Sequence, residues 1–393
     1  MLRRIEIENF FSIRDRQVLD LSIAANATDP DGRFAIPIET SDARFPCVVA
    51  LFGPNASGKT TFLKAIIFLR DFILHSHKWP KANSMNGIPC FSTKEARENP
   101  MSFFIEFDTE IDEGQSKIVF QYELTLGKDS NVLREVLSYR PDKRMRLLFE
   151  RTQSGIKAGA DFRLPKRDPV REKIKSHVSA ISVLAQFNHN LSEKLVNSIS
   201  HVFSNVLPLG KGNFDEKTIT RIYSNNEDLF KSLNDEISMF DLGIERVEIE
   251  DSENGLTPFF THKGLDFKVG INLESQGTKN FYRLYPAIWS VLEAGSVAVW
   301  DEFDNDIHPL FLPELIKRFQ DPQTNPKNAQ LIISCHNVSL LEHLAKEEVV
   351  FTEKDDQGKS SIYRLADIQG VRRDTNIYAK YLMGVYGAVP RLA

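Results

Sequence analysis

The chain has 393 residues, of which 41% are hydrophobic and 26% are charged. This is enough apolar material for two or three packed units, so the composition excludes a disordered chain or a disulfide-stabilised mini-domain. Lysine and arginine number 49 and aspartate and glutamate number 54, for a net charge of −5. The chain as a whole therefore carries no positive field that would attract nucleic acid or anionic lipid.

The cysteines and the apolar runs indicate the expected compartment. Cys47, Cys90 and Cys335 are odd in number and widely spaced, which argues against a disulfide framework and against a CxxC zinc pair. No apolar run approaches the roughly 20 residues that a membrane helix requires. We expect a cytoplasmic protein that is neither exported nor membrane-spanning.

The periodicity of the apolar residues predicts a mixed α/β chain. Alternation of apolar and polar residues, or a short apolar run, predicts a strand, and apolar residues three or four positions apart predict a helix. The expected strands fall within residues 2–22, 46–52, 101–152, 245–250, 266–272, 296–300, 330–334, 349–351 and 361–363. The expected helices cover residues 60–70, about 168–240 with breaks, about 277–293, and 309–320.

Residues 53–60 carry a nucleotide-binding motif. They fit G-x-x-x-x-G-K-[ST] and lie between an apolar strand and a helix, which is the context that the motif requires. Backbone N–H groups of the loop would surround phosphates, Lys59 would meet the β- and γ-phosphates, and the Thr60 hydroxyl would complete a Mg²⁺ shell. The alternative is a chance glycine turn. The candidate nucleotide-binding residues are Gly53, Pro54, Asn55, Ala56, Ser57, Gly58, Lys59, Thr60 and Thr61.

A second apolar strand ends in two adjacent carboxylates, Asp301 and Glu302. Open α/β sheets place ligands at the carboxyl ends of their strands. Asp301 would hold Mg²⁺ directly or through water, and Glu302 would act as the general base or polariser for the attacking water. Because Asp304, Asp306 and His308 follow, the alternatives are a two-metal hydrolase site and an acidic loop without a ligand.

Two further polar segments are candidates for the same site. His336 follows the expected strand 330–334 and would emerge beside the acidic pair, where it would contact the γ-phosphate. A thiol catalyst made of Cys335 and His336 is disfavoured because neighbouring side chains on a strand point to opposite faces, and a structural histidine is the other alternative. The turn Ser275-Gln276-Gly277 precedes a helix and suits an anion, although alone it is only a helix cap.

The motifs together resemble a known ATPase head. The ordered segments GPNASGKT, ESQGT, VAVWDEFDNDIHP and SCHN look like the Walker A, signature, Walker B with D-loop, and H-loop of ABC-type heads in SMC, RecF and overcoming-lysogenization-defect proteins. The resemblance implies an α/β P-loop head that hydrolyses ATP with Mg²⁺. It also implies an N-terminal antiparallel β-subdomain and a helical lobe inserted between Walker A and the signature.

The resemblance further implies how the site residues act. It assigns catalysis to Glu302, Lys59 and His336 of one chain, and it makes Ser275, Gln276 and Gly277 act on the γ-phosphate held by a neighbouring chain. ATP would then drive head-to-head homo-oligomers. The family also uses a Q-loop glutamine, for which Gln115 and Gln121 are the candidates by position.

A closer resemblance covers nearly the whole chain. The segments IENFFSI from Ile7, LAQFN from Leu184, DLGI from Asp241 and YLMGVYGAVP from Tyr381 look like RloA-like stand-alone ABC-type ATPases. That group includes ATPase subunits of phage-defence systems such as PARIS. The resemblance implies a sensor or scaffold in antiviral defence, whose ATP-driven oligomerisation controls a separate toxin or nuclease encoded nearby.

The expected domain organisation follows this pattern. Residues 1–160 would form the N-terminal part of the ATPase core, 161–262 the helical insertion, and 263–393 the C-terminal part of the core.

A RecF-like DNA-repair ATPase is the alternative function, and a scaffold that binds ATP without hydrolysis is a third. For the DNA alternative, a basic stripe would supply the contacts, whereas the simpler interpretation is a solvated helix face. The stripe comprises Lys166, Arg167, Arg171, Lys173 and Lys175.

Overall fold

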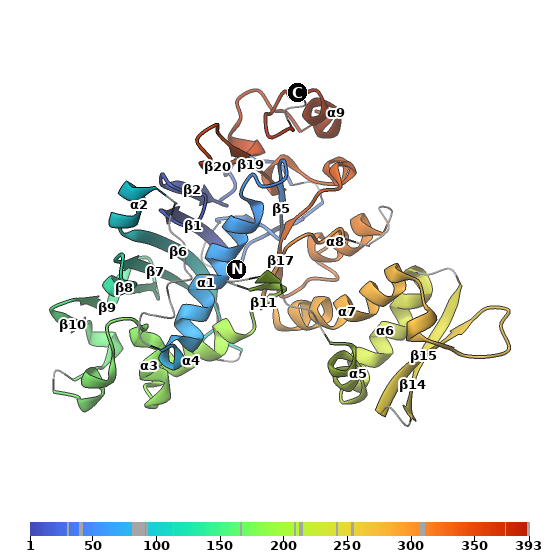
Figure 1. Cartoon of the computed structure of the whole chain (residues 1–393), viewed down its shortest axis with the longest axis horizontal. Coiled ribbons are helices and arrows are strands. Elements are labelled where there is room, and N and C mark those ends of the chain that lie inside the picture. The colour runs from blue at the N-terminus through green and yellow to red at the C-terminus, as the bar shows by residue number, and fades with distance from the viewer. Residues whose placement is uncertain are drawn as a thin grey trace.

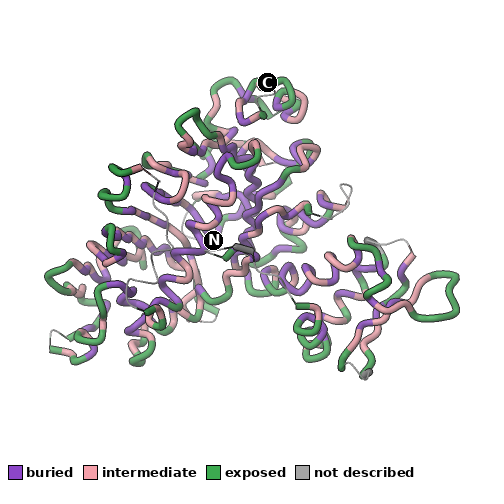
Figure 2. The backbone as a smooth tube through the Cα atoms, in the orientation of Figure 1, coloured by how far each residue is buried: buried purple, intermediate pink, exposed green. Residues whose placement is uncertain are grey.

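The computed structural model describes residues 1–29, 31–38, 42–80, 91, 93–112, 114–165, 167–207, 210–211, 215–240, 243–252, 255–305, 311–373 and 375–390. Its centre is helix α1 (Lys59–His75), which lies between an antiparallel sheet and a mainly parallel sheet (Figure 1). Figure 2 shows buried residues concentrated around this helix and the strands beside it. The α/β class predicted from the sequence is confirmed.

The antiparallel sheet has seven strands in the order β10-β9-β8-β7-β6-β1-β2. Every neighbouring pair in it is antiparallel, as the alternating pattern predicts. Its strands are β1 (Leu2–Glu8), β2 (Gln17–Asp20), β6 (Met101–Thr109), β7 (Ile118–Leu126), β8 (Val132–Arg140), β9 (Arg146–Thr152) and β10 (Gly155–Ala158). Two short pairs stand apart from it: β3 (Phe34–Ala35) with β4 (Phe45–Pro46), and β12 (Val206–Leu207) with β13 (Gly210–Lys211).

The second sheet has six strands in the order β11-β17-β18-β5-β19-β20. All neighbours run parallel except β19 and β20, so the strands that precede the sequence motifs end at one edge of the sheet. The strands are β5 (Val48–Phe52), β11 (Phe203–Ser204), β17 (Val297–Trp300), β18 (Gln330–Ser334), β19 (Val349–Lys354) and β20 (Ser360–Arg364).

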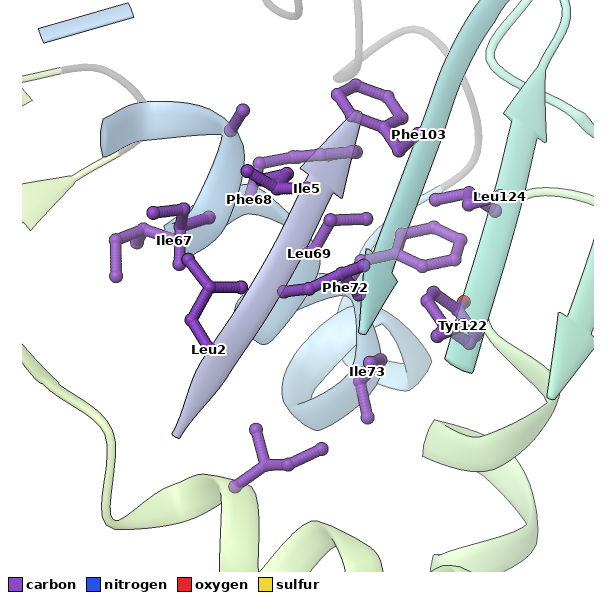
Figure 3. Close-up of a cluster of buried hydrophobic side chains, with 14 of the residues drawn as sticks. Leu2, Ile5, Ile67, Phe68, Leu69, Phe72, Ile73, Phe103, Tyr122 and Leu124 are labelled. Atoms are coloured by element: carbon purple, nitrogen blue, oxygen red, sulfur yellow. The ribbon is translucent and has the colours of Figure 1, made fainter. Parts of the chain in front are cut away.

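Apolar residues three and four positions apart on α1 pack it onto the antiparallel sheet. Phe68 and Phe72 face Phe103 of β6, and the Phe68 and Phe103 ring centroids are 5.2 Å apart (Figure 3). Aromatic pairs at this separation add to the stability gained from burial. The packing holds the helix that begins at the P-loop rigidly against the sheet.

The remaining helices occupy two places. Helices α3 (Ala180–Gln186) and α4 (Asn190–Ser200) belong to the same hydrophobic core as α1. Other segments form a projecting body, seen on the right of Figure 1. This projecting body contains α5 (Glu216–Ser224), α6 (Glu227–Phe240), β14 (Ile244–Ser252), β15 (Gly255–His262), β16 (Val269–Gly270) and the start of α7 (Gln276–Ala294). Helices α2 (Lys94–Glu98), α8 (Leu312–Gln320) and α9 (Ile377–Leu382) complete the set in the described chain.

Helix α7 joins the projecting body to the parallel sheet. It begins after Ser275 and ends at Gly295, whose φ of 60° gives the left-handed cap that glycine favours. Strand β17 starts two residues later. None of the helices in the described part combines the length and apolar character needed to cross a membrane.

A buried carboxyl group gives the fold a pH dependence. Glu348 accepts hydrogen bonds from Gln320 at 2.9 and 3.0 Å and pairs with Arg33 at 3.3 Å. Burial nonetheless raises the pKa of Glu348 to about 7, against the opposing effect of Arg33. Because the folded state binds this proton more tightly than the unfolded state, the group stabilises the fold most below pH 4.5, and this contribution is lost as the pH rises through 7.

We therefore expect Glu348→Gln to flatten the pH dependence of stability. Between pH 4.5 and 7, the wild-type group should lose about 3 kcal/mol of its contribution to the free energy of unfolding. Urea unfolding at several pH values would measure this difference, with the exposed Glu342→Gln as the matched control. Identical pH profiles for wild type and Glu348→Gln would contradict the expectation.

Candidate functional site

The P-loop connects the end of β5 to the start of α1. Gly53 and Gly58 have φ values of 151° and 118°, which side chains with a Cβ rarely adopt. A Cβ on Gly53 would also lie 2.3 Å from the carbonyl oxygen of Thr352, and one on Gly58 would lie 2.5 Å from Ser360 Oγ. Packing of β19 and β20 against the loop therefore requires glycine at both positions.

The ammonium of Lys59 lies against the carbonyls of its own loop. Its Nζ donates to Gly53 O at 2.7 Å and to Pro54 O at 3.0 Å. Burial lowers the pKa of this ammonium, and the carboxylates of Asp301, Asp304 and Glu302 act in the opposite direction. The cation is thus held inside the loop, facing the acidic strand end.

Thr60 and Asp301 meet across the sheet edge. The Thr60 hydroxyl lies 3.0 and 3.2 Å from the two carboxylate oxygens of Asp301, and Ser334 Oγ donates to Asp301 at 2.5 Å. These are hard oxygen donors of the kind that Mg²⁺ prefers. Thr60 and Asp301, which are 241 positions apart in the chain, therefore lie together as the pair predicted from the sequence to hold Mg²⁺.

Glu302 follows in a constrained backbone conformation. Its φ is 53°, which is uncommon for a residue other than glycine and is often found at functional sites. Its N–H donates to Ser334 Oγ at 2.7 Å. Ser334 thus holds both Asp301 and Glu302 in place from the neighbouring strand.

His336 lies one strand away, and its backbone is held by Asp304. The Asp304 carboxylate accepts from the N–H groups of His336 at 2.9 Å and Asn337 at 2.6 Å. Cys335 is buried, and burial raises the pKa of its thiol. A neutral thiol is a poor nucleophile, so the structure offers no support for a catalyst made of Cys335 and His336.

Asn205 is a residue that the sequence analysis missed. It follows β11, a strand of two residues, and its side chain bonds both backbone groups of Asp301: Nδ2 donates to Asp301 O at 3.0 Å, and Oδ1 accepts from Asp301 N at 2.8 Å. Asn205 therefore fixes the backbone from which the acidic pair projects. A strand this short has no periodicity that could reveal it.

A cavity of about 1280 Å³ brings these groups together. Its walls also include residues that were not predicted as site residues, from the β1–β2 connection and from the β19–β20 turn. The lining residues are Phe11, Ser12, Asn55, Ala56, Ser57, Gly58, Lys59, Thr60, Thr61, Phe91, Thr93, Asp301, Glu302, Asp304, Asn305, His336, Lys354, Gln357 and Gly358. Gly53 and Pro54 lie behind the lining and contact it through Lys59.

The turn Ser275-Gln276-Gly277 lies elsewhere. It begins α7 in the projecting body and does not line the cavity of its own chain (Figure 1). Ser275 Oγ accepts from Thr278 N at 3.1 Å, and the side chains of Ser275 and Gln276 are exposed. Within one chain, the structure therefore brings together the P-loop, the acidic strand end and His336, but not this turn.

Other candidate residues from the sequence also lie away from the cavity. Gln121 is on the antiparallel sheet, where it donates to Glu106 at 2.6 Å, and Gln115 does not line the cavity either. The Arg171 side chain of the basic stripe donates to three backbone carbonyls and so is used within the fold. Lys166 of that stripe lies outside the described residues.

The two-metal alternative depends on Asp306 and His308, which also lie outside the described residues. Among the residues that the structure does describe, no group of three or more histidine, cysteine, aspartate or glutamate side chains could hold a metal ion. The pair of Thr60 and Asp301 is not such an all-protein metal site, because a nucleotide-bound Mg²⁺ takes its further ligands from phosphate oxygens and water.

Two solved SMC heads are similar to this chain over most of its length. Among solved structures, an SMC head domain from Thermotoga maritima is 15% identical with a TM-score of 0.44, covering 92% of this chain and 98% of that one. An SMC head bound to the C-winged helix domain of ScpA is 14% identical with a TM-score of 0.40, covering 92% and 97%. No curated protein matches the chain.

A protein-family model matches residues 48–342, from the first residue of β5 to the end of the 3₁₀ turn after His336. The matched span contains the P-loop, the acidic strand end and the signature-like turn. Because it covers more than half of the chain, the protein belongs to the P-loop ATPase family described as AAA domain, putative AbiEii toxin, Type IV TA system.

Proposed function

We propose that this protein is an ABC-type ATPase that hydrolyses ATP at the cavity beside the P-loop. The observation that carries the proposal is the contact between Thr60 and Asp301 at 3.0 Å, with Glu302 as the next residue. Loop N–H groups and Lys59 would hold the phosphates of ATP. Glu302 would accept the proton of the attacking water, and His336 would contact the γ-phosphate.

Mg²⁺ is the cofactor that fits the oxygen donors present. The Thr60 hydroxyl and the Asp301 carboxylate would hold it, and when bound it would neutralise charge on the phosphates. Ser334 and Asn205 would keep Asp301 in position through the hydrogen bonds already described. Glu302 has no role in holding the ion and so remains available as a base.

The signature-like turn would complete the site of a second copy. Ser275, Gln276 and Gly277 begin α7 outside their own cavity, and apolar side chains are exposed in the same part of the chain. Leu273 is 82% exposed and Phe267 is 67% exposed, so both are available for contact with a second chain. We infer a head-to-head homo-oligomer in which ATP lies between one chain's P-loop and the other chain's turn.

A mixing experiment tests action between chains. Lys59→Ala damages the P-loop side and Gly277→Asp damages the turn, so a heterodimer of the two would keep one intact composite site, and ATPase activity should partly recover. A mixture of Lys59→Ala with Glu302→Gln is the matched control, because both lesions lie on the P-loop side and no composite site is intact. No recovery in the first mixture, with heterodimers verified, would refute the proposal.

We further propose that the ATPase acts in antiviral defence and controls a separate effector encoded nearby. Support comes from the RloA-like segments in the chain and from the toxin–antitoxin wording of the family description. Phage plating on cells that carry the gene and its neighbours would test this, with Glu302→Gln as the variant that should lose protection. Absence of protection, together with ATP-dependent binding of gapped DNA that weakens steeply with salt, would favour the RecF-like alternative.

A further inference from the structure

A second cavity, of about 770 Å³, lies at the opposite end of α1 from the P-loop. Its walls come from the second half of α1, from β6, from α4, and from the turn between α7 and β17. It shares no lining residue with the nucleotide cavity. The two cavities are therefore separate sites joined by α1 and β17, since each element lines the second cavity at one end and leads to the nucleotide site at the other.

The inner wall of this second cavity is apolar. Leu69 and Ile73 of α1 contribute to it together with Leu2 of β1, at the edge of the core drawn in Figure 3. Ile105 and Phe107 extend this surface along β6. A concave surface of this size and character suits the apolar body of a small ligand.

Three charged side chains that line the cavity, Asp108, Arg70 and Lys194, form ion pairs with residues behind its wall. Lys194 pairs with Asp112 at 2.5 Å, and Asp108 accepts from Arg3 Nε at 2.8 Å. Arg70 pairs with Asp71 at 2.7 Å. These charges are therefore neutralised within the fold and do not call for a ligand.

Lys117 and Ser296 also line the cavity, but unlike the residues above they have no charged partner in the described part of the chain. Lys117 Nζ donates to the carbonyls of Lys327 at 3.1 Å and Gly295 at 3.3 Å, and among the described residues its hydrogen bonds go to carbonyls, not to a carboxylate. Ser296 Oγ is buried and has no hydrogen-bond partner in the described part of the chain. Lys117 bonds the carbonyl of Gly295, the residue before Ser296, so the ammonium and the hydroxyl line the same end of the cavity, where an anionic group could accept hydrogen bonds from both.

We propose that the second cavity binds a small amphipathic anion, with its apolar body on α1 and β6 and its anionic group at Lys117 and Ser296. Binding there alters ATP turnover, because the ligand contacts the ends of α1 and β17 remote from the nucleotide. The binding stands on the cavity alone, whereas its effect on turnover rests on the proposed ATPase function.

Calorimetric titration of the full-length protein with decanoate, below its micellar concentration, tests the binding. We expect saturable binding of one decanoate per chain, and binding of decanol, which lacks the charge, weaker by about tenfold. Lys117→Met should weaken decanoate binding by a similar factor. Lys157→Met, which removes an exposed lysine of β10 outside the cavity, should leave it unchanged.

A second variant tests whether decanoate binds in this cavity, and it keeps the test valid if Lys117→Met fails to fold. Ala294 is exposed and lines the cavity, so Ala294→Trp should block it without disturbing the core, and decanoate binding should be lost. Binding that survives this change would overturn the site, and equal affinities for decanoate and decanol would overturn the role of the charge. The absence of any saturable decanoate binding to the wild type would overturn the proposal as a whole.

The effect on turnover is measured separately. Decanoate should change the ATPase rate of the wild type and leave that of Ala294→Trp unaffected, and an unchanged wild-type rate at saturation would overturn the regulatory part. Decanoate binding to Glu302→Gln should match that of the wild type, because Glu302 lies in the other cavity. Failure of the ATPase proposal would therefore leave the binding result intact, and the two failures can be told apart.

Discussion

Replacement of Glu302 by glutamine should lower ATP turnover by about 10²- to 10⁴-fold while ATP remains bound. Glutamine keeps the size of the side chain and its place after Asp301, but it cannot accept a proton from water. The N–H of residue 302 still donates to Ser334, so the local backbone should be retained. Steady-state ATPase assays and equilibrium nucleotide binding on the same preparation would measure the two effects separately.

Lys59→Ala should have the complementary result. Removal of the ammonium takes away the charge-assisted contacts to the phosphates, so ATP affinity should fall by about 100-fold or more. The exposed Glu314→Gln and Lys231→Ala, on α8 and α6, are matched controls for the loss of each charge. Equal losses of ATP affinity in Glu302→Gln and Lys59→Ala would contradict the division of roles between the two residues.

Gly53→Ala should prevent the P-loop from forming and abolish ATP binding. The added Cβ would lie 2.3 Å from the carbonyl oxygen of Thr352, and that carbonyl cannot retreat because β19 is paired with both β5 and β20. Overpacking against backbone and the unfavourable φ together should cost about 3 kcal/mol or more of the free energy of unfolding.

Gly264→Ala is the control that separates the clash from the dihedral angle. Gly264 also has a positive φ, of 79°, but a Cβ there would meet nothing within 4 Å. This variant should lose only about 1 kcal/mol and keep wild-type ATP affinity. Chemical unfolding and nucleotide titration of both variants would check this, and comparable losses in the two would show that the contact with Thr352 is unimportant.

Much of the site could be predicted because its main signals are local in the sequence. The P-loop follows an apolar strand, and Asp301 and His336 follow two others, so a parallel sheet necessarily brings the three segments to one edge. The observed strand order, with β18 between β17 and β5, produces this meeting. The antiparallel pairing within residues 2–22 and within residues 101–152 could likewise be predicted from alternation, whereas the joining of the two groups through β1 and β6 could not.

Other parts of the site depend on contacts that no local pattern encodes. Asn205 holds the backbone of Asp301 from a strand of only two residues, and Lys354 and Gln357 reach the cavity because the β19–β20 turn packs over the P-loop. Such placements result from strand pairing between distant segments. Neither propensity nor periodicity reports that pairing.

The sequence by itself determined the α/β class, the strands and helices that flank the motifs, and the nucleotide motif, because each rests on spacing within a few turns of helix or residues of strand. Only the tertiary structure decided that helices α3 and α4 pack with α1 while α5 and α6 lie in the projecting body. It alone also decided that Lys117 and Ser296 share a cavity at the far end of α1. These neighbours are selected by the packing of apolar faces from distant parts of the chain. A helix with one apolar face can bury that face against more than one partner, so its own sequence does not say which partner it packs on.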